Sequence, residues 1–157
     1  MQHLTPKTSR GAAETVGHLV GAHATVTRQL SAQLVERHGL TLSEYEVLLL
    51  LSRQPDRSMR RVDLSREVRL SPSGVTRMLD RMETTGLVEK GACKSDARVT
   101  YAVLTEAGMT KLRDCSPDHF AAVERLIRER LSDEEIESLS GLLSRLSDLD
   151  DDCTVGD

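Results

Sequence analysis

Residues 61–108 contain the pattern that most constrains the fold of this chain. A short apolar-periodic stretch leads to Ser71-Pro72, a second periodic stretch follows, and Gly86 ends it. Serine before proline is a typical helix start, because the serine side chain accepts hydrogen bonds from the first turn and proline has no N–H to lose. Glycine readily adopts the left-handed conformation that ends a helix. The pattern predicts two short helices joined by a tight turn.

Two apolar segments after Gly86 predict a hairpin beside these helices. One strand is expected to begin at residues 87–90 and the other to return over residues 99–104, with a charged loop between them. Two helices joined by a short turn can place the second in the major groove of DNA, and a neighbouring hairpin can reach the backbone or the minor groove. The segment predicts a winged helix-turn-helix with a two-stranded β wing.

The second helix of this motif has an apolar and a polar face. Apolar side chains recur at three- and four-residue spacing and are expected to face the core: Val75, Met78, Leu79 and Met82. The opposite face has short polar groups near its start and charged groups further along: Ser73, Thr76, Arg77, Asp80 and Arg81. This polar face is therefore the one expected to meet DNA.

The distribution of charge supports DNA as the partner, although the net charge of the chain is −4. Residues 53–98 hold 11 Lys and Arg against 7 Asp and Glu, a net of +4, so the rest of the chain has a net of −8. Affinity for the duplex comes from local neutralisation of phosphates. The basic charge lies where the motif predicts DNA contact.

Composition excludes several other classes of protein. A chain of 157 residues with 38% hydrophobic content predicts one modest globular unit. Residues 1–10 are polar and no apolar run is long enough to cross a bilayer, so a cytoplasmic protein without membrane contact is expected. Aromatic residues make up 2%, which disfavours a base-stacking platform for RNA or single strands. No carboxylate pair, nucleophile with a base or phosphate loop stands out, so neither an enzyme nor a cofactor is predicted.

Helices are expected on both sides of the motif. A first helix over about residues 12–38 carries Leu19, His23, Val26 and Leu30 as an apolar seam, and Gly39 ends it. Thr41-x-x-Glu44 is a capping box that predicts a second helix, with a buried apolar run over residues 47–51. After the hairpin, Thr105 caps a helix that reaches about residue 131.

This later helix is expected to break or kink near Ser116-Pro117, because proline removes a backbone hydrogen bond. Ser132-x-x-Glu135 is another capping box, and the helix after it has apolar residues at coiled-coil spacing: Ile136, Leu139, Leu143 and Leu146. The terminal apolar seams predict either a second subunit that covers them or packing on the chain's own core.

The motifs of the hairpin resemble those of one known family. Asp96-x-Arg98 precedes Val103-Leu104-Thr105-x-x-Gly108, and both follow S-x-S-x-V-T-R at residues 71–77 and E-x-x-G-L-V at residues 83–88. This order resembles the wing signature of the MarR family, the multiple-antibiotic-resistance regulators, over nearly the whole chain. The resemblance implies a homodimeric repressor or activator that binds a short palindrome and often responds to a small molecule, a metal or an oxidant.

The resemblance also implies a domain organisation. The fold is expected to be mainly α, with a winged-helix lobe over about residues 41–104 inside a single unit of residues 11–147. The helices over about residues 12–38 and 105–147 are expected to form a dimerisation domain, which favours a second subunit over self-packing. Disordered tails are expected at residues 1–10, which lack an apolar pattern, and at the acidic residues 148–157.

The resemblance assigns DNA contact to residues of both the helix and the wing. A wing arginine such as Arg98 can enter a narrow minor groove, and Asp96 is placed to hold it. Without the resemblance, a solvated ion pair within the turn is an equal explanation, and for Ser71 helix capping is the simplest one. The predicted DNA-contacting residues are Ser71, Ser73, Gly74, Thr76, Arg77, Arg81, Lys94, Ser95, Asp96 and Arg98.

The sequence leaves the effector open. The resemblance implies a small aromatic or phenolic ligand between the dimer helices and the DNA-binding lobe. Cys115-x-x-x-His119 has a spacing that suits a metal, but Pro117 lies between them, and lone Cys and His residues more often pack or face solvent. Cys93 in the wing is a candidate exposed thiol, with only Lys94 nearby to activate it.

Two alternatives belong to other functional classes. The first is a winged helix that binds only proteins and shows no salt-dependent affinity for duplex DNA. The second is the dimerisation domain of a small-molecule methyltransferase, which is disfavoured because no glycine-rich cofactor loop follows. A metal-sensing or redox-sensing member of the same family is a further variant of the leading interpretation.

Overall fold

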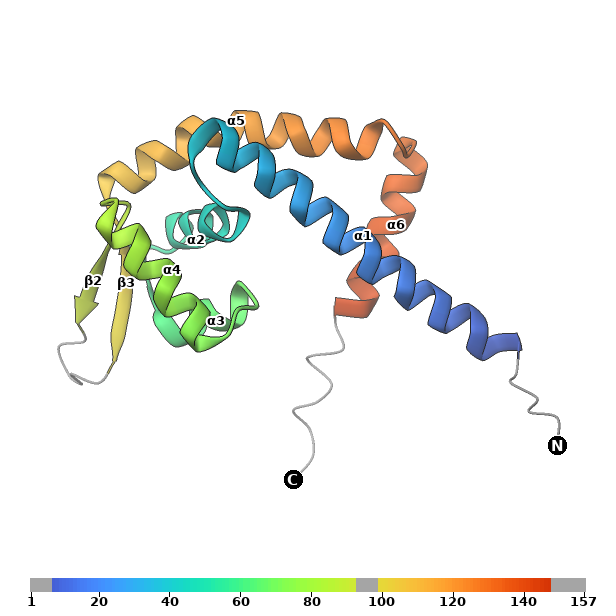
Figure 1. Cartoon of the computed structure of the whole chain (residues 1–157), viewed down its shortest axis with the longest axis horizontal. Helices are drawn as coiled ribbons and strands as arrows, with labels where there is room; N and C mark the ends of the chain where they lie inside the picture. The colour runs from blue at the N-terminus through green and yellow to red at the C-terminus, as the bar shows by residue number, and fades with distance from the viewer. Residues whose placement is uncertain (1–6, 93–98, 148–157) are drawn as a thin grey trace, which may run out of the picture. The chain divides into compact units, whose positions relative to one another are not determined.

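The computed structural model describes residues 7–92 and 99–147 as a mainly helical chain with one small sheet (Figure 1). Its elements are α1 (Lys7–His38), α2 (Leu42–Ser52), β1 (Ser58–Arg60), α3 (Arg61–Glu67), α4 (Pro72–Thr84), β2 (Val88–Ala92), β3 (Thr100–Leu104), α5 (Glu106–Arg128) and α6 (Asp133–Ser147). The chain divides into two compact units, one up to His119 and one from Phe120. Among the described helices, none combines the length and the apolar character that a membrane span requires.

Helix α1 begins at Lys7, five residues before the expected start, so residues 7–10 are helical and not part of a disordered tail. These residues lack apolar periodicity, but extending a helix that has already formed adds one hydrogen bond per residue. The helix ends as predicted, with Gly39 in the left-handed region at φ 67°. Residues 1–6 and 148–157, where tails were expected, lie outside the described residues.

The predicted capping box of α2 is present. The Thr41 backbone N–H donates to Glu44 Oε2 at 2.7 Å, and the Glu44 N–H donates to Thr41 Oγ1 at 3.3 Å. Of the apolar run expected to be buried, Val47, Leu48 and Leu51 are fully covered, whereas Leu49 and Leu50 are only partly buried. Helix α2 therefore begins at a polar cap and continues into the core.

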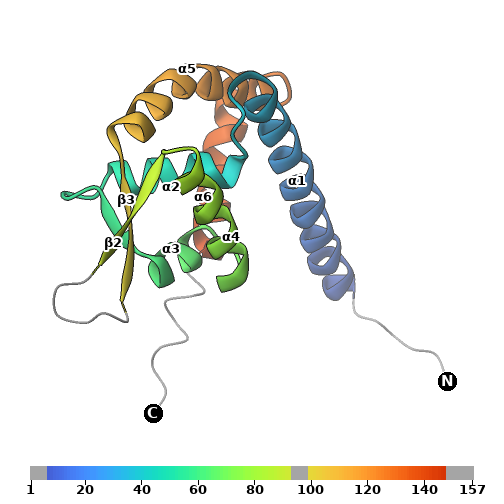
Figure 2. The ribbon, with the colours of Figure 1, turned by 60° about the vertical axis from the view of Figure 1, so that its left-hand side comes forward.

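The sheet has three strands in the order β1-β3-β2, all antiparallel, and not only the two strands of the wing. Strand β1 pairs with β3 in the register Ser58↔Val103, and β2 pairs with β3 from Val88↔Leu104 to Ala92↔Thr100. Figures 1 and 2 show β2 and β3 side by side. The sequence did not predict β1 because three residues are too few to display a period of two.

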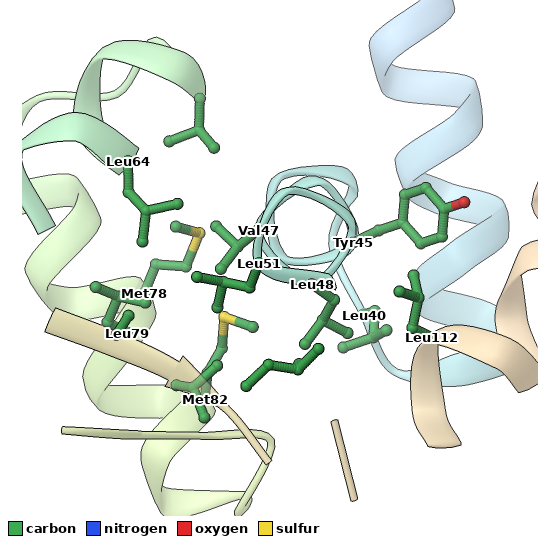
Figure 3. Close-up of a cluster of buried hydrophobic side chains, with 14 of the residues drawn as sticks. Leu40, Tyr45, Val47, Leu48, Leu51, Leu64, Met78, Leu79, Met82 and Leu112 are labelled. Atoms are coloured by element: carbon green, nitrogen blue, oxygen red, sulfur yellow. The ribbon is translucent and has the colours of Figure 1, made fainter. Parts of the chain in front are cut away.

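The core of the first unit surrounds α2. Figure 3 shows side chains from α3, α4 and α5 converging on this helix, with Val47 and Leu51 toward α4 and Tyr45 on the other side. The largest fully buried side chains are Leu34, Leu48, Leu51, Leu64, Leu79, Met82, Val47, Val75 and Cys115. Burying a side chain of this size contributes about 1.5 to 3 kcal/mol. The helix-turn-helix is thus built directly onto α2.

Helix α5 runs through Pro117 without interruption, so the expected break is wrong. Contacts on both sides of the proline hold the helix: Cys115 is buried in the core, and Asp118 Oδ2 lies 2.9 Å from His38 Nε2 of α1. The Ser116 hydroxyl also donates to the Leu112 carbonyl at 2.7 Å. These tertiary contacts outweigh the loss of one backbone hydrogen bond.

In the second unit, α6 begins at the predicted capping box. The Ser132 N–H donates to Glu135 Oε2 at 2.8 Å and the Glu135 N–H donates to Ser132 Oγ at 3.3 Å. No residue of α6 is buried, although the helix is amphipathic. Its exposed large apolar side chains are Leu139, Leu142, Leu143 and Leu146.

Candidate nucleic-acid interface

The start of α4 has the predicted geometry. Ser71 is the N-cap, and its Oγ accepts from the Gly74 N–H at 3.1 Å, while Pro72 occupies the first helical position. A Cβ atom at Gly74 would lie 3.1 Å from this same Oγ, so glycine leaves the cap uncrowded. The helix ends before Gly86, which has a φ of 74° as expected. Local sequence signals therefore fix both ends of α4.

The two faces of α4 are also as predicted. Val75, Met78, Leu79 and Met82 are buried. Ser73, Thr76, Arg77 and Asp80 are exposed on the other side. The Thr76 hydroxyl donates to the Pro72 carbonyl at 2.9 Å, which holds this short side chain close to the helix. Arg77 is the cation that this face extends into solvent within its first two turns.

Arg81, the last predicted contact on this helix, has a partner within the protein. Its Nε donates to Glu44 Oε1 of α2 at 2.7 Å, while its side chain is 58% exposed. Whether Arg81 also meets DNA stays a prediction. The sequence signal for Glu44 was the capping box alone, and that signal does not reveal a partner from α4.

A second polar cluster ties α4 to α3 and to the wing, and sequence reasoning missed it. Glu83 of α4 pairs with Arg61 at the start of α3. Lys90 Nζ of β2 lies 3.3 Å from Glu83 Oε2 and 3.9 Å from Asp80 Oδ1. The partners lie on different elements, so no spacing along one helix or strand could reveal them.

The base of the wing is held by Thr105. Its hydroxyl donates to the Gly86 carbonyl at 2.7 Å and accepts from the Gly108 N–H at 3.0 Å, which confirms the predicted cap of α5. The predicted contacts in the tip, Lys94, Ser95, Asp96 and Arg98, lie outside the described residues, as does Cys93. Strand β2, which leads toward this tip, is tied to α4 through Lys90 and its contacts with Glu83 and Asp80, and Figure 2 shows β2 beside β3.

Comparisons with known proteins agree with this geometry. The family model described as "MarR family" matches residues 38–99, which include α2 to β2. The HTH-type transcriptional regulator MhqR of Bacillus subtilis (strain 168) is 33% identical over 112 residues, which are 71% of this chain and 75% of MhqR. The chain belongs to the MarR family of transcriptional regulators.

Solved MarR-family structures have the same fold. AbsC, a MarR family transcriptional regulator from Streptomyces coelicolor, superposes with a TM-score of 0.78 and 33% identity over 94% of this chain and 97% of AbsC. Sco3205 from the same organism was crystallised in complex with DNA and has a TM-score of 0.80 at 24% identity, over 94% of this chain and 91% of Sco3205. The winged helix-turn-helix predicted from the sequence is confirmed.

The two candidate metal ligands of this MarR-family chain are part of its packing. Cys115 is fully buried, and burial raises the pKa of its thiol. The His119 ring lies 4.4 Å from the Tyr45 ring, and burial lowers the pKa of the imidazole. In residues 7–92 and 99–147, no three His, Cys, Asp or Glu residues are grouped so as to hold a metal ion.

A groove of about 390 Å³ lies beside the helix-turn-helix. Its walls come from α1, α2 and the turn between α3 and α4: His23, Thr27, Leu42, Ser43, Glu46, Leu49, Leu50, Glu67, Val68, Arg69 and Leu70. Burial raises the pKa of the Glu46 carboxyl, with Arg69 and His23 acting in the opposite direction. Arg69 has a φ of 52°, a conformation unusual for a residue other than glycine.

Proposed function

We propose that this MarR-family regulator is a sequence-specific repressor that binds a palindromic operator in duplex DNA as a homodimer in the cytoplasm. The observation that carries the proposal is α4, whose apolar face is buried in the core while Ser73, Thr76 and Arg77 remain exposed. A helix presented in this way suits the major groove, where each base pair has its own pattern of donors and acceptors. The DNA complex of Sco3205 supports the same use of this fold.

Exposed apolar side chains support the homodimer. In the first unit, α1 exposes Val16, Leu19 and Val20, and in the second unit α6 exposes four leucines. Val26 of the predicted α1 seam is half-buried and Leu30 is buried, so the chain's own core covers only the C-terminal part of this seam. We infer that a second subunit covers the remainder, because exposed apolar faces of this kind mark interfaces. A two-fold dimer would hold two α4 helices about one turn of DNA apart, roughly 34 Å.

We further propose that the groove between α1, α2 and the α3–α4 turn binds the effector, a small aromatic or phenolic molecule. Its walls join α1 to the turn directly before Ser71, so a ligand there can bias the position of α4. Phenol and benzoate, added to the protein bound to operator DNA, are the first probes. Release of DNA by either probe, and loss of that response in Leu49→Trp, which fills the groove, would support the assignment. Retained response in Leu49→Trp would contradict it.

Binding-site selection from a random duplex library tests the DNA-binding function. The wild-type protein is expected to enrich a palindrome, with affinity that falls steeply as salt rises. Arg77→Ala is expected to cost about 1 to 3 kcal/mol and to relax preference at one position in each half-site, since Arg77 lies on the exposed face of α4. Arg98→Ala is expected to weaken binding to all operator variants together, with specificity lost only at flanking A·T-rich steps.

The two variants also define the outcomes that contradict the proposal. A wild-type protein that enriches no sequence and shows no salt-dependent duplex binding is a protein-interaction module instead. If Arg98→Ala binds as tightly as the wild type, the wing does not contact DNA through that residue. Unchanged preference in Arg77→Ala would remove Arg77 from the base-contacting set.

A further inference from the structure

The apolar face of α4 does not by itself decide which side chains the helix presents to DNA. Burial of Val75, Leu79 and Met82 is favourable in proportion to the area removed from water, and this effect has no direction. Hydrogen bonds do have direction, because they weaken steeply away from a linear geometry. The polar contacts along the edges of α4 therefore constrain its rotation and its position along its axis in addition to the packing of its apolar face.

Among these polar contacts, the one between Arg81 and Glu44 has the most buried acceptor. Arg81 Nε donates to Glu44 Oε1 at 2.7 Å, and the Glu44 side chain is only 6% exposed. The other oxygen, Oε2, accepts from the Thr41 backbone N–H at 2.7 Å and from the Thr41 hydroxyl at 3.0 Å. One carboxylate thus completes the start of α2 and binds α4, and the capping box fixes the direction in which it meets Arg81.

The charge at position 44 is explained by Arg81 and not by the capping box. A capping box is formed by glutamate or by glutamine at its fourth position, since either side chain offers an oxygen to the N-cap N–H. A glutamine that keeps this bond has only its NH₂ group left for Arg81, and a donor would then face a donor. Only a carboxylate serves both partners, and a charged acceptor also makes the stronger hydrogen bond.

We propose that Glu44 is a positioning residue for DNA recognition, which acts through Arg81 to set the orientation of α4. The proposal rests on the proposed function, because it concerns the same helix and the same DNA. When the bond is broken, α4 can rotate or shift on its apolar face, and Arg77 no longer meets its base in the same place. Arg81 then influences binding through Glu44, not through a phosphate or a base of its own.

A double-mutant cycle with Glu44→Gln and Arg81→Met tests this role. Glu44→Gln keeps the cap and removes the acceptor, and Arg81→Met keeps an apolar chain of similar reach. Affinity is measured by fluorescence anisotropy for the duplex selected by the wild type and for an unrelated duplex of equal length, at several salt concentrations. Each variant is expected to lower the ratio of the two affinities about tenfold, which corresponds to roughly 1.4 kcal/mol.

The cycle separates a positioning role from direct contact. The double variant is expected to lose no more than either single variant, because both remove the same bond. The salt dependence is expected to stay that of the wild type, since no phosphate contact is lost. Glu135→Gln, the same substitution in the capping box of α6, is the matched control and is expected to keep the wild-type ratio.

Three results would overturn the proposal. The first is a Glu44→Gln variant that keeps the wild-type ratio of affinities for the selected and the unrelated duplex. The second is a double variant whose loss equals the sum of the two single losses. The third is a salt dependence of affinity whose slope falls by about 1 in Arg81→Met, which would show that Arg81 binds a phosphate. If Glu44→Gln does not fold, Arg81→Met alone tests the proposal. A lower ratio of the two affinities with an unchanged salt dependence supports a positioning role, and a weaker salt dependence contradicts it. If the wild-type protein binds all duplexes equally, the proposed function is contradicted. If the wild type prefers the selected duplex and Glu44→Gln prefers it to the same degree, only the role of Glu44 is contradicted.

Discussion

Gly108 lies where α5 meets Leu87, the residue before β2, and no side chain fits there. A Cβ atom there would lie 2.1 Å from the Leu87 carbonyl oxygen and 2.7 Å from Leu104 Cδ1. The carbonyl is itself fixed, because it accepts from the Thr105 backbone N–H at 3.2 Å and from the Thr105 hydroxyl at 3.0 Å. The Leu104-Thr105-x-x-Gly108 motif therefore has a packing reason, in which threonine caps α5 and glycine lets it approach the wing.

Gly108→Ala is accordingly expected to destabilise the protein by about 1 to 3 kcal/mol, the usual cost of overpacking. Urea unfolding followed by circular dichroism measures the change. Gly141→Ala is the matched control, because nothing lies within 4 Å of a Cβ there and α6 continues on both sides. That variant is expected to be more stable than the wild type, by about 0.5 to 1 kcal/mol. Equal stability of Gly108→Ala and the wild type would contradict the packing explanation.

At the scale of elements, the sequence was informative for helix caps and for the glycines that end helices, because these signals are local. The caps at Thr41, Ser71 and Ser132 and the left-handed glycines at positions 39 and 86 were confirmed because neighbouring residues alone determine them. Strand β1 was missed because it has only three residues and because its partner β3 is distant in sequence. The contacts of Glu44 and Glu83 join different helices, so the sequence indicated the polar face of α4 but not what holds it in place.

The same distinction explains why α5 passes through Pro117. Local rules predict a break, but the segment around the proline is held by the core and by α1 and α2. Within this segment the His119 ring packs against Tyr45, and Asp118 binds His38 and Arg37. Burial lowers the pKa of His119, and hydrogen bonds from His38 and Arg37 lower the pKa of Asp118. The stability of the segment around Pro117 is therefore expected to depend on pH.

Stability should consequently fall as the pH drops below about 6.5, the ordinary pKa of histidine. A histidine whose folded pKa is depressed stabilises the fold fully above its unfolded pKa, and this contribution is lost as the pH falls toward the folded pKa. His119→Phe retains a ring beside Tyr45 and cannot titrate, so its stability should fall less between pH 7.5 and 5.5. Urea unfolding at several pH values compares the two slopes. Identical slopes would show that His119 does not contribute.

At the scale of the whole molecule, charge and apolar surface are segregated in a way that suits a dimeric DNA-binding protein. Residues 53–98 have a net charge of +4, whereas the rest of the chain has a net charge of −8 and would repel a duplex. The exposed large apolar side chains lie mostly on α1 and α6 and not on the exposed polar face of α4. Periodicity predicted the apolar face of α6, where Leu139, Leu143 and Leu146 are exposed, but of the seam predicted on α1 only Leu19 is among the exposed large apolar side chains.

Replacing Leu143 and Leu146 of α6 with aspartate is expected to give a folded monomer that has lost most of its affinity for the operator. Neither side chain belongs to the buried core, so charging them leaves that core intact. It does place charge in an apolar interface, which is costly for association. Without the dimer, the two half-sites must be bound independently, and the gain in effective concentration is lost.

Static light scattering at micromolar concentration and gel shifts with the selected operator check both parts of this prediction. Ser138→Asp/Ser144→Asp adds the same charge to α6 at positions outside its apolar stripe, and is expected to remain dimeric and to bind DNA. Circular dichroism should show the same helix content in all three proteins. A wild type that is already monomeric, or a leucine variant that still forms dimers, would show that α6 is not the interface and that its apolar face has another partner.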